Sequence, residues 1–395
     1  MPSKIKKRGV NSYLLSVKYQ QKEYTKTVYT ESKNEADRLW KLFASEVIQG
    51  NALSGDTQKM TLLQFYDYWK RHYAVKNNEL TTIAYDDSLF IRAGATLGHL
   101  KIDKILPRHI LEFLDQLSAP DAGHGNKPLS PNTIRKHYNL LTTLFNAAKQ
   151  WKFVINNPLD DIKPPKQTKP NKKIASEEAM TLFLEKLSHE TLKHQLWVLL
   201  AFGKGLRREE IFGLQWGDFD FEKNTVTISR AAVYITGIGI TIKDTKSDNS
   251  YRTLSLPTDI VTMIKMWKEE VKIAAQRRNK RLKIIIMDDP VSVEKWIFSQ
   301  VNGNPGHPHS FNTFLKRFYN ANNDLPKLSP HLLRHMTGSY LIRSGVDVAS
   351  VSAELGHSNK AFTMNTYIHE LESAKEHAAT TMQGILNNLK PKTSF

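Results

Sequence analysis

Two short segments of the chain place a cation three residues from a polar partner. In GLRREE, Arg207 and Glu210 follow two glycines, so on a helix the carboxylate can brace the guanidinium. In SPHLLRH, His331 and Arg334 have the same spacing just after Pro330, next to the positive helix terminus at which anions bind. Each pair alone is a common surface feature, and it is their presence in one chain that is unusual.

A third segment, ELGHSNKAFTMNTYIHE, adds an imidazole and a phenol. His357 follows a glycine turn, and Tyr367 lies ten residues later in an otherwise polar stretch. A single tyrosine is usually half-buried in a core. This residue therefore gains meaning only from the basic groups that precede it.

Several other chemistries lack their motifs in this sequence. There is no glycine-rich loop of the Walker type and no H-E-x-x-H pattern, and the adjacent Asp288 and Asp289 fit a turn better than a metal site. The absence of cysteine excludes disulfides, zinc ribbons and thiol nucleophiles. We expect no metal and no cofactor, so any reaction must use oxygen and nitrogen groups.

The composition is that of a folded, basic protein. Of 395 residues, 40% are hydrophobic and 10% aromatic, and 56 Lys and Arg against 39 Asp and Glu give a net charge of +17. That excess indicates a polyanionic partner. No apolar run approaches the ~20 residues of a membrane-spanning helix, and the basic N-terminus has no apolar segment behind it. The sequence therefore predicts a cytoplasmic protein with no membrane partner.

The first module, residues 1–50, is small and basic. Alternation over 15–20 and a Thr, Tyr and Val-rich run at 24–30 predict a β-hairpin, and apolar residues at helical spacing over 36–47 predict one covering helix. A sheet of two or of three strands fits this pattern. Residues 51–59 are typical of a linker. The first ten residues contain no acid and four cations, namely Lys4, Lys6, Lys7 and Arg8.

The second domain, residues 58–165, is predicted to be helical throughout. Its last long helix begins after Ser130, a plausible N-cap, and carries an apolar stripe over 134–148. Arg135 and Lys136 lie on the opposite face. Taken alone, such charges are typical of a solvated helix surface.

A basic tether, residues 163–173, marks the next domain boundary. It contains five lysines, three prolines and no acid, so it is extended, and contact with phosphates explains its charge better than an ordinary linker does. Its candidate phosphate ligands are Lys163, Lys166 and Lys169. Beyond it the chain is mainly helical, with strands predicted at 225–229, 233–241 and 252–256.

In their order, these segments resemble the tyrosine recombinase family, in particular the integrases of temperate phages and integrative conjugative elements. The resemblance rests on the Gly-Leu-Arg box with Glu three residues on, then His-x-x-Arg-His, then Leu-Gly-His, and then Tyr367 followed by His369. It covers nearly the whole chain. Residues 130–148 with the following INNPLDDIKPPK are similar to the end of the family's core-binding domain, and residues 1–50 to its arm-binding module.

The resemblance implies a role for each residue of these motifs. Arg207 and Arg334 would clamp the scissile phosphate, and His331 would take or position the proton of the nucleophile. His357 would hydrogen-bond a non-bridging oxygen. Tyr367 would attack phosphorus to give a 3′-phosphotyrosyl link.

The family's general acid is a lysine on a β-hairpin, and here two lysines compete for that role. Lys246 is the first choice and Lys243 the second. The interval from Lys246 to Arg252 is longer than family members commonly show, which leaves the register of the hairpin open. Glu210 is a candidate supporting residue, because it can brace the Arg207 guanidinium.

Elementary chemistry agrees with these roles. A phosphodiester gains negative charge in its transition state, and fixed guanidinium and imidazole donors can stabilise that charge without a metal. A free tyrosine, with a pKa of ~10, is a poor nucleophile that cations and a basic imidazole can activate. Because the covalent link conserves the phosphodiester energy, no ATP is needed.

The family implies a multidomain fold that is mainly α with small β-sheets. The expected parts are an arm-binding module of sheet and helix (1–50), a helical, SAM-like core-binding domain (58–165) and a mixed α+β catalytic domain (174–395). The expected partners are double-stranded DNA with core and arm attachment sites and further copies of the chain in a tetramer. An excisionase and a host DNA-bending protein are further candidates.

Two alternatives remain in view. A type IB topoisomerase-like enzyme works as a monomer and needs no arm-binding module, so residues 1–50 argue against it. A non-catalytic DNA-binding regulator with the same fold would be free to lose the arginines, histidines or tyrosine. All of these are present, so the sequence favours a recombinase.

The tail after Tyr367 contains an apolar stripe at helical spacing that must be covered by some surface. In this family such a helix commonly docks onto a neighbouring protomer. A stripe does not specify whose surface covers it, so docking on its own domain stays open although we expect exchange. The residues of the stripe are Ala378, Met382, Ile385, Leu386 and Leu389.

Overall fold

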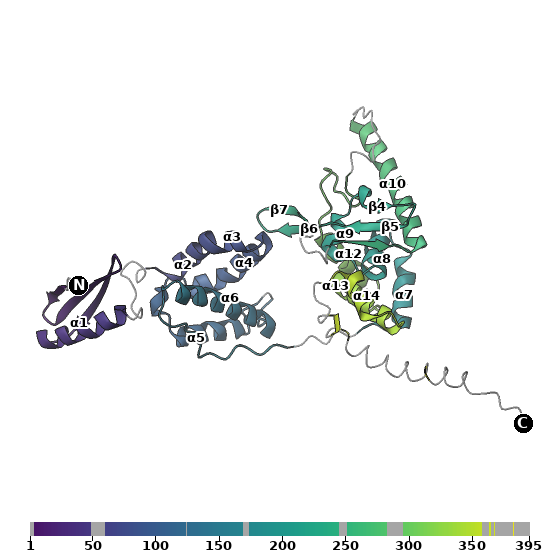
Figure 1. Cartoon of the computed structure of the whole chain (residues 1–395). Coiled ribbons are helices and arrows are strands. Elements are labelled where there is room, and N and C mark those ends of the chain that lie inside the picture. The colour runs from purple at the N-terminus through teal and green to yellow at the C-terminus, as the bar shows by residue number, and fades with distance from the viewer. Residues whose placement is uncertain are drawn as a thin grey trace, which may run out of the picture. The chain divides into compact units, whose positions relative to one another are not determined.

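The computed structural model describes most of the chain in two compact units. The described residues are 4–48, 60–123, 125–168, 174–244, 251–282, 295–357, 363, 364, 367 and 382. The first unit is Met1–Pro170 and the second Asn171–Phe395, so the division falls within the basic tether. Helices dominate both, with small antiparallel sheets, which confirms the predicted fold class (Figure 1).

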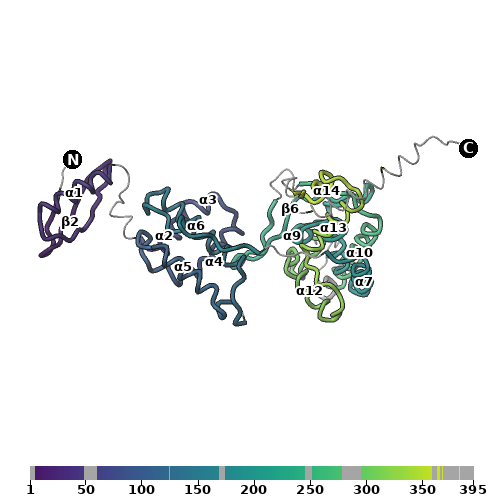
Figure 2. The backbone as a smooth tube through the Cα atoms, turned by 90° about the horizontal axis from the view of Figure 1, so that it is seen from below, coloured from purple at the N-terminus to yellow at the C-terminus, as the bar shows by residue number. Residues whose placement is uncertain are grey.

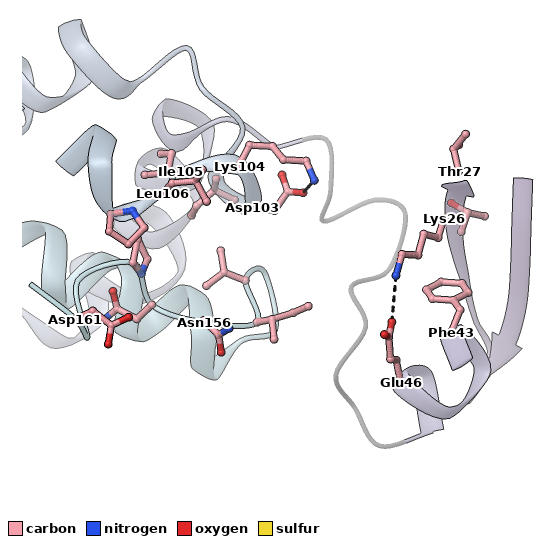
Figure 3. Close-up of a pocket in the computed structure, with 17 residues that line it drawn as sticks. Lys26, Thr27, Phe43, Glu46, Asp103, Lys104, Ile105, Leu106, Asn156 and Asp161 are labelled. Atoms are coloured by element: carbon pink, nitrogen blue, oxygen red, sulfur yellow. Dashed lines mark hydrogen bonds and ion pairs between the residues drawn. The ribbon is translucent and has the colours of Figure 1, made fainter. Parts of the chain in front are cut away.

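The N-terminal module has three strands, which decides between the two alternatives left by the sequence. The antiparallel sheet has the order β1-β2-β3, and one helix covers it. Leu15 and Val17 point inward from β2 because side chains alternate along a strand, and they pack against Phe43 of the helix. Lys26 and Glu46 form an ion pair of 3.4 Å beside that phenylalanine (Figure 3). The elements are β1 (Lys4–Gly9), β2 (Ser12–Tyr19), β3 (Lys22–Tyr29) and α1 (Lys33–Ile48).

The helical domain that follows has its own core. Large side chains from four helices meet there, among them Phe65, Trp69, Phe113 and Phe145. As predicted, Ser130 caps the last helix by accepting a hydrogen bond from the Thr133 amide. The helices are α2 (Leu62–Trp69), a π-helical turn η2 (Lys70–Ala74), α3 (Val75–Asn77), α4 (Leu80–Leu97), the 3₁₀ turn η3 (Ile102–Lys104), α5 (Pro107–Ser118) and α6 (Pro131–Gln150).

The second unit combines helices with two small sheets. One sheet has the order β4-β5-β8, and the other is the hairpin β6-β7. Its elements are α7 (Glu177–Leu187), α8 (Leu192–Gly203), α9 (Arg208–Gly213), η4 (Trp216–Asp218), β4 (Phe219–Asp220), β5 (Thr225–Ile228), β6 (Arg230–Ile235), β7 (Gly239–Asp244), β8 (Arg252–Ser255), α10 (Thr258–Leu282), α12 (His309–Ala321), α13 (Pro330–Arg343) and α14 (Val348–Leu355).

The strand predicted at 233–241 is wrong, because the chain reverses within it. Gly237 and Gly239 have φ of 82° and 102°, values that suit glycine, and they form the turn of the β6-β7 hairpin. Both flanking strands are rich in β-branched residues, so the sequence pattern alone predicts one continuous strand. As a consequence β7 pairs with β6, and β8 pairs with β5.

Helix α8 contacts both α13 and α9. This helix packs against α13, where Thr337 Oγ1 donates to Phe202 O at 2.5 Å. After α8 the chain turns at Gly205, whose φ is 62° and where an added Cβ would lie 2.3 Å from a Leu355 methyl carbon. The turn leads into α9, which lies close to α13 in both views (Figures 1 and 2), and Arg207 just before α9 reaches the carbonyl of Gly356 at the end of α14.

Candidate active site

Glu210 lies at the centre of the candidate site. Its side chain is buried, and its two carboxylate oxygens accept hydrogen bonds from two arginines. Arg207 donates from Nη1 to Oε1 at 2.6 Å and from its backbone N–H to Oε2 at 2.8 Å. Arg252 donates to the same two oxygens at 3.1 and 2.9 Å, and Arg334 Nη1 lies 3.9 Å from Oε2. Three guanidiniums thus surround one carboxylate.

The carbonyl groups at the end of α14 hold the same three arginines. Arg252 Nε donates to the carbonyl of Glu354 at 3.0 Å, Arg334 Nη2 to that of Leu355, and Arg207 Nη2 to that of Gly356 at 2.9 Å. Helix C-termini favour cations because their last carbonyls lack intrahelical partners. The end of α14 therefore acts as a second anchor for the cluster.

The predicted pair Arg207 and Glu210 is confirmed as a contact, with one difference of position. Arg207 does not lie within the helix but is its N-cap residue, one position before α9. Of the other pair, both members lie on α13, where Arg334 is buried and donates from Nη1 to Gly205 O at 2.6 Å. His331, in the first turn of α13, is exposed.

A cavity of about 270 Å³ opens beside the cluster. Arg207 and Arg334 of the cluster line this cavity, and so does the exposed His331. A phosphate there would therefore meet guanidinium and imidazole groups together. The lining residues are Arg207, Arg208, Glu209, Asn312, Ser329, Pro330, His331 and Arg334.

His357 follows the left-handed Gly356 that ends α14. Its Nδ1 lies 2.7 Å from Thr363 Oγ1. Burial, and then the charges of Arg334 and Arg207, lower the pKa of His357 to about 4. The imidazole is therefore neutral at neutral pH and has one N–H to donate.

Tyr367 lies against α13, next to the arginine cluster. It is 2% exposed, and its ring meets that of His335 edge to face with centroids 4.9 Å apart. Its backbone N–H donates to Thr363 O at 3.1 Å. A Cβ added at Gly338 would lie 2.3 Å from the phenolic oxygen, so the glycine makes room for the hydroxyl one turn after Arg334.

The electrostatics of the cluster favour an anion. Burial alone would raise the pKa of Glu210, but the hydrogen bonds and charge of Arg252, with the charges of Arg207 and Arg334, hold it below its usual value. Burial, and then the charge of Arg207, lower the pKa of Arg334 to about 9. Arg334 is thus charged at neutral pH, and the cluster sets three guanidiniums against one carboxylate.

Only one of the two candidate general acids lies within the described residues. Lys243 lies on β7, paired in register with Ala231, and is half-buried. Lys246 lies outside the described residues. The choice between them stays a prediction.

The candidate DNA ligands of the first unit lie mostly on its surface. Lys6, Lys7 and Arg8 on β1 are exposed, as is Lys136 on α6. The side chain of Lys4 lies outside the described residues.

The first half of the tether is held against the start of α6. Arg135 donates from Nη1 to Pro165 O at 2.8 Å, and the Asn132 side chain exchanges two hydrogen bonds with the backbone of Thr168. Lys163 and Lys166 are exposed along this stretch, while Lys169 lies outside the described residues. Arg135 thus fastens the tether, a role that the sequence did not predict.

Sequence reasoning missed two residues of the site. Arg252 occupies an inward position of β8: it and Leu254 are buried, and Thr253 between them is exposed. A cation at such a position signals a buried ion pair. Thr363 links His357 to Tyr367, and no pattern in the sequence distinguishes it.

The described residues contain neither a metal-binding cluster nor a membrane-spanning helix. Within the ranges given above, no group of three or more His, Cys, Asp or Glu side chains could hold a metal ion. Within the same ranges, no helix has the length and apolar character required to cross a membrane.

Comparison with known proteins identifies the chain's relatives. The tyrosine recombinase XerC-like protein of Caldanaerobacter subterraneus subsp. tengcongensis is 28% identical, covering 96% of this chain and 97% of that protein. The ICEBs1 integrase of Bacillus subtilis is 26% identical and covers 72% of each chain.

Two solved structures share the fold. The Tn1549 transposon integrase, in complex with a circular intermediate DNA, has a TM-score of 0.65 at 24% identity and covers 81% of this chain and 100% of that one. A lambda integrase tetramer bound to a Holliday junction has a TM-score of 0.52 at 14% identity, with coverage of 91% and 97%.

The phage integrase family model matches residues 174–374, which is just over half of the chain and includes the whole arginine cluster, His357 and Tyr367. With its arginines, histidines and tyrosine in the order of that family, the chain belongs to the phage integrase family and is a tyrosine recombinase.

Proposed function

We propose that this tyrosine recombinase cuts and rejoins DNA strands at paired sites, integrating or excising a mobile element through a 3′-phosphotyrosyl intermediate. The observation that carries the proposal is the cluster of three arginines around the buried Glu210, which opens onto a cavity beside His331. Its excess positive charge suits a phosphate whose oxygens gain negative charge during the reaction. The family and the named relatives support the same class of reaction.

The cleavage step assigns one task to each group. Tyr367 Oη attacks phosphorus and loses its proton to or through His331, while the bond from phosphorus to the 5′ oxygen breaks. Arg207 and Arg334 stabilise the charge on the non-bridging oxygens, and neutral His357 donates one further hydrogen bond. A lysine protonates the departing 5′ oxygen. Rejoining reverses these steps with the 5′ hydroxyl of another strand.

Thr363 fits this scheme by its contact with His357. If its hydroxyl donates to Nδ1, the proton of the neutral ring lies on Nε2, which can then donate to a phosphate oxygen. Tyr367 is closed off from solvent, so DNA binding must uncover the phenol before it can attack.

The expected partners follow from the same proposal. The chain binds core and arm sites in double-stranded DNA and acts as a tetramer, which the lambda integrase tetramer on a Holliday junction supports by its likeness of fold. We expect the arm-binding module at 1–50, the core-binding domain at 58–165 and the catalytic domain at 174–395. An excisionase and a host DNA-bending protein complete the proposed assembly, on DNA in the bacterial cytoplasm.

A direct test uses DNA from the direct repeats that flank the element. The purified chain is incubated with a nicked duplex of this sequence in EDTA, without nucleotide, and analysed on a denaturing gel. We expect a DNA–protein adduct that survives denaturation, because neither metal nor ATP enters the mechanism. Tight binding of the duplex without any adduct would instead favour the non-catalytic regulator.

The identity of the general acid is tested with a substrate whose 5′-bridging oxygen is replaced by sulfur. A thiolate leaves without protonation, so this substrate should restore cleavage to Lys246→Ala but not to Arg207→Ala, whose task is charge stabilisation. Adduct formation on the two substrates is compared for each variant. Restoration of Lys243→Ala alone would move the role to that residue.

The proposed arm-binding module is tested by removing it. A fragment that starts at Met60 should bind and cleave core-site DNA as the full chain does but lose binding to arm-site DNA, because the basic β1 and its sheet have a core of their own. Mobility shifts on the two DNAs measure this. Equal arm-site binding by fragment and full chain would contradict the assignment.

A further inference from the structure

Arg252 is a buried arginine to which the cleavage mechanism gives no role. It is the first residue of β8 and is 9% exposed. Burying a guanidinium is costly unless its charge and its donors are matched. Here Glu210 supplies the charge and two acceptors, and the Glu354 carbonyl accepts from Nε.

Arg252 completes two sets of contacts that also hold the phosphate-facing arginines. At Glu210, each carboxylate oxygen accepts one hydrogen bond from Arg252 and one from Arg207. At the end of α14, three successive carbonyls each accept from a different arginine of the cluster. Arg252 therefore shares both anchors with Arg207 and Arg334.

Arg252 differs from Arg207 and Arg334 in its position relative to the cavity. Arg207 and Arg334 line the cavity beside His331, whereas Arg252 is not among the described residues that line it. It meets Glu210 from the side of β8. Arg252 would therefore affect a phosphate in the cavity through Glu210 and the end of α14, which it contacts.

We propose that Arg252 is a positioning residue for strand cleavage: it holds Glu210 and the end of α14 so that Arg207, Arg334 and His357 face the scissile phosphate in fixed positions. The proposal rests on the recombinase function. It adds a residue to that function which neither touches DNA nor exchanges a proton.

The physical reason lies in the sharing of one carboxylate. With Arg252 present, Glu210 is matched by an arginine that does not line the cavity, and the two guanidiniums that do line it keep their charge for the phosphate. Without it, the carboxylate draws on Arg207 and Arg334 alone. The carbonyl of Glu354, which immediately precedes the two carbonyls that hold those arginines, also loses its donor.

The main test replaces Arg252 by methionine, which fills a similar space without charge. We expect Arg252→Met to form the covalent adduct about 30-fold to 100-fold more slowly. Its affinity for a half-site, the part of a core site that one protomer binds, should change by less than about threefold. Arg252→Lys restores the charge but cannot make all three hydrogen bonds, so it should recover only part of the rate. Rates come from nicked half-site DNA and affinities from mobility shifts.

A matched control separates positioning from folding. Arg230 on β6 makes a comparable pair with Asp218, at 2.9 and 2.7 Å, outside the cluster. Arg230→Met should also lower the thermal midpoint, because it breaks a partly buried ion pair, but it should leave the adduct rate near that of the unaltered chain. Equal rates for Arg252→Met and the unaltered chain would overturn the proposal.

A double substitution adds a measurement that a purely structural role would not move. If Arg252 works through Glu210, then Arg252→Met combined with Glu210→Gln should be no slower than the slower single variant, within about threefold. Losses that multiply would show that Arg252 acts elsewhere and would overturn the proposal.

Inorganic phosphate keeps this test distinct from that of the recombinase function. Phosphate should raise the thermal midpoint of the unaltered chain more than that of Arg252→Met, because the guanidiniums are preset only in the former. This difference supports the proposal even if no adduct forms, in which case the recombinase function alone fails. An equal rise in both proteins contradicts the positioning role.

Discussion

Tyr367→Phe should abolish the covalent DNA adduct while the protein still binds its site. The substitution removes the phenolic oxygen alone, and without a nucleophile the adduct should fall by at least about 10⁴-fold. The buried ring keeps its edge-to-face contact with His335, so the fold should not suffer. A nicked duplex analysed on a denaturing gel measures the adduct, and a mobility shift measures binding.

Tyr340 provides the control for this substitution. It lies on α13, the helix that also contacts Tyr367, and packs edge to face on Phe202 with centroids 5.6 Å apart. Tyr340→Phe removes the same atom nearby and should leave adduct formation unchanged. An adduct that persists in Tyr367→Phe would show that another group is the nucleophile.

Arg334→Ala should have the next largest effect on cleavage. Its guanidinium lines the cavity, and the loss of one fixed donor to a developing oxyanion costs about 10²- to 10³-fold in rate. The bridging-sulfur substrate should not restore this loss, because the missing group is not the proton donor. Adduct rates on the two substrates measure the effect.

The same substitution should also destabilise the second unit, which contains Arg334. It leaves the carbonyls of Gly205 and Leu355 without this donor, at roughly 1–3 kcal/mol for each group that stays buried and unpaired. The loss is reduced because removing one cation relieves repulsion with Arg207 and Arg252. Thermal melts measure the net change.

The control for Arg334 lies on the same helix. Arg343 is an exposed arginine in the last turn of α13, and Arg343→Ala should leave both the adduct rate and the thermal midpoint almost unchanged. Arg334→Lys should stay slow, because an ammonium cannot reproduce the planar fork that serves two carbonyls and a phosphate. Cleavage by Arg334→Ala at the rate of the Arg343 control would refute a role at the phosphate.

The sequence alone predicted the class of chemistry. The order of the arginine, histidine and tyrosine motifs predicted the family, and the net charge predicted a polyanionic partner. Local patterns also predicted the Ser130 cap and the contact between Arg207 and Glu210, which are three residues apart. These features depend on neighbours in the chain, so periodicity and spacing are enough to find them.

Other local features were ambiguous for a physical reason. The stretch 233–241 is rich in β-branched residues on both sides of its turn, so the pattern did not mark the reversal that Gly237 and Gly239 allow. Strand propensity does not specify which strands pair.

Only the tertiary structure decided how the site is held together. The contact between Arg207 and the carbonyl of Gly356 spans 149 residues, and that between Arg252 and the carbonyl of Glu354 spans 102. Such contacts depend on how α8, α13, α14 and β8 pack, which no local pattern contains. The burial of Tyr367 against Gly338 is of the same kind. The sequence thus predicts which groups carry the chemistry, and packing decides which of them share one carboxylate and one helix end.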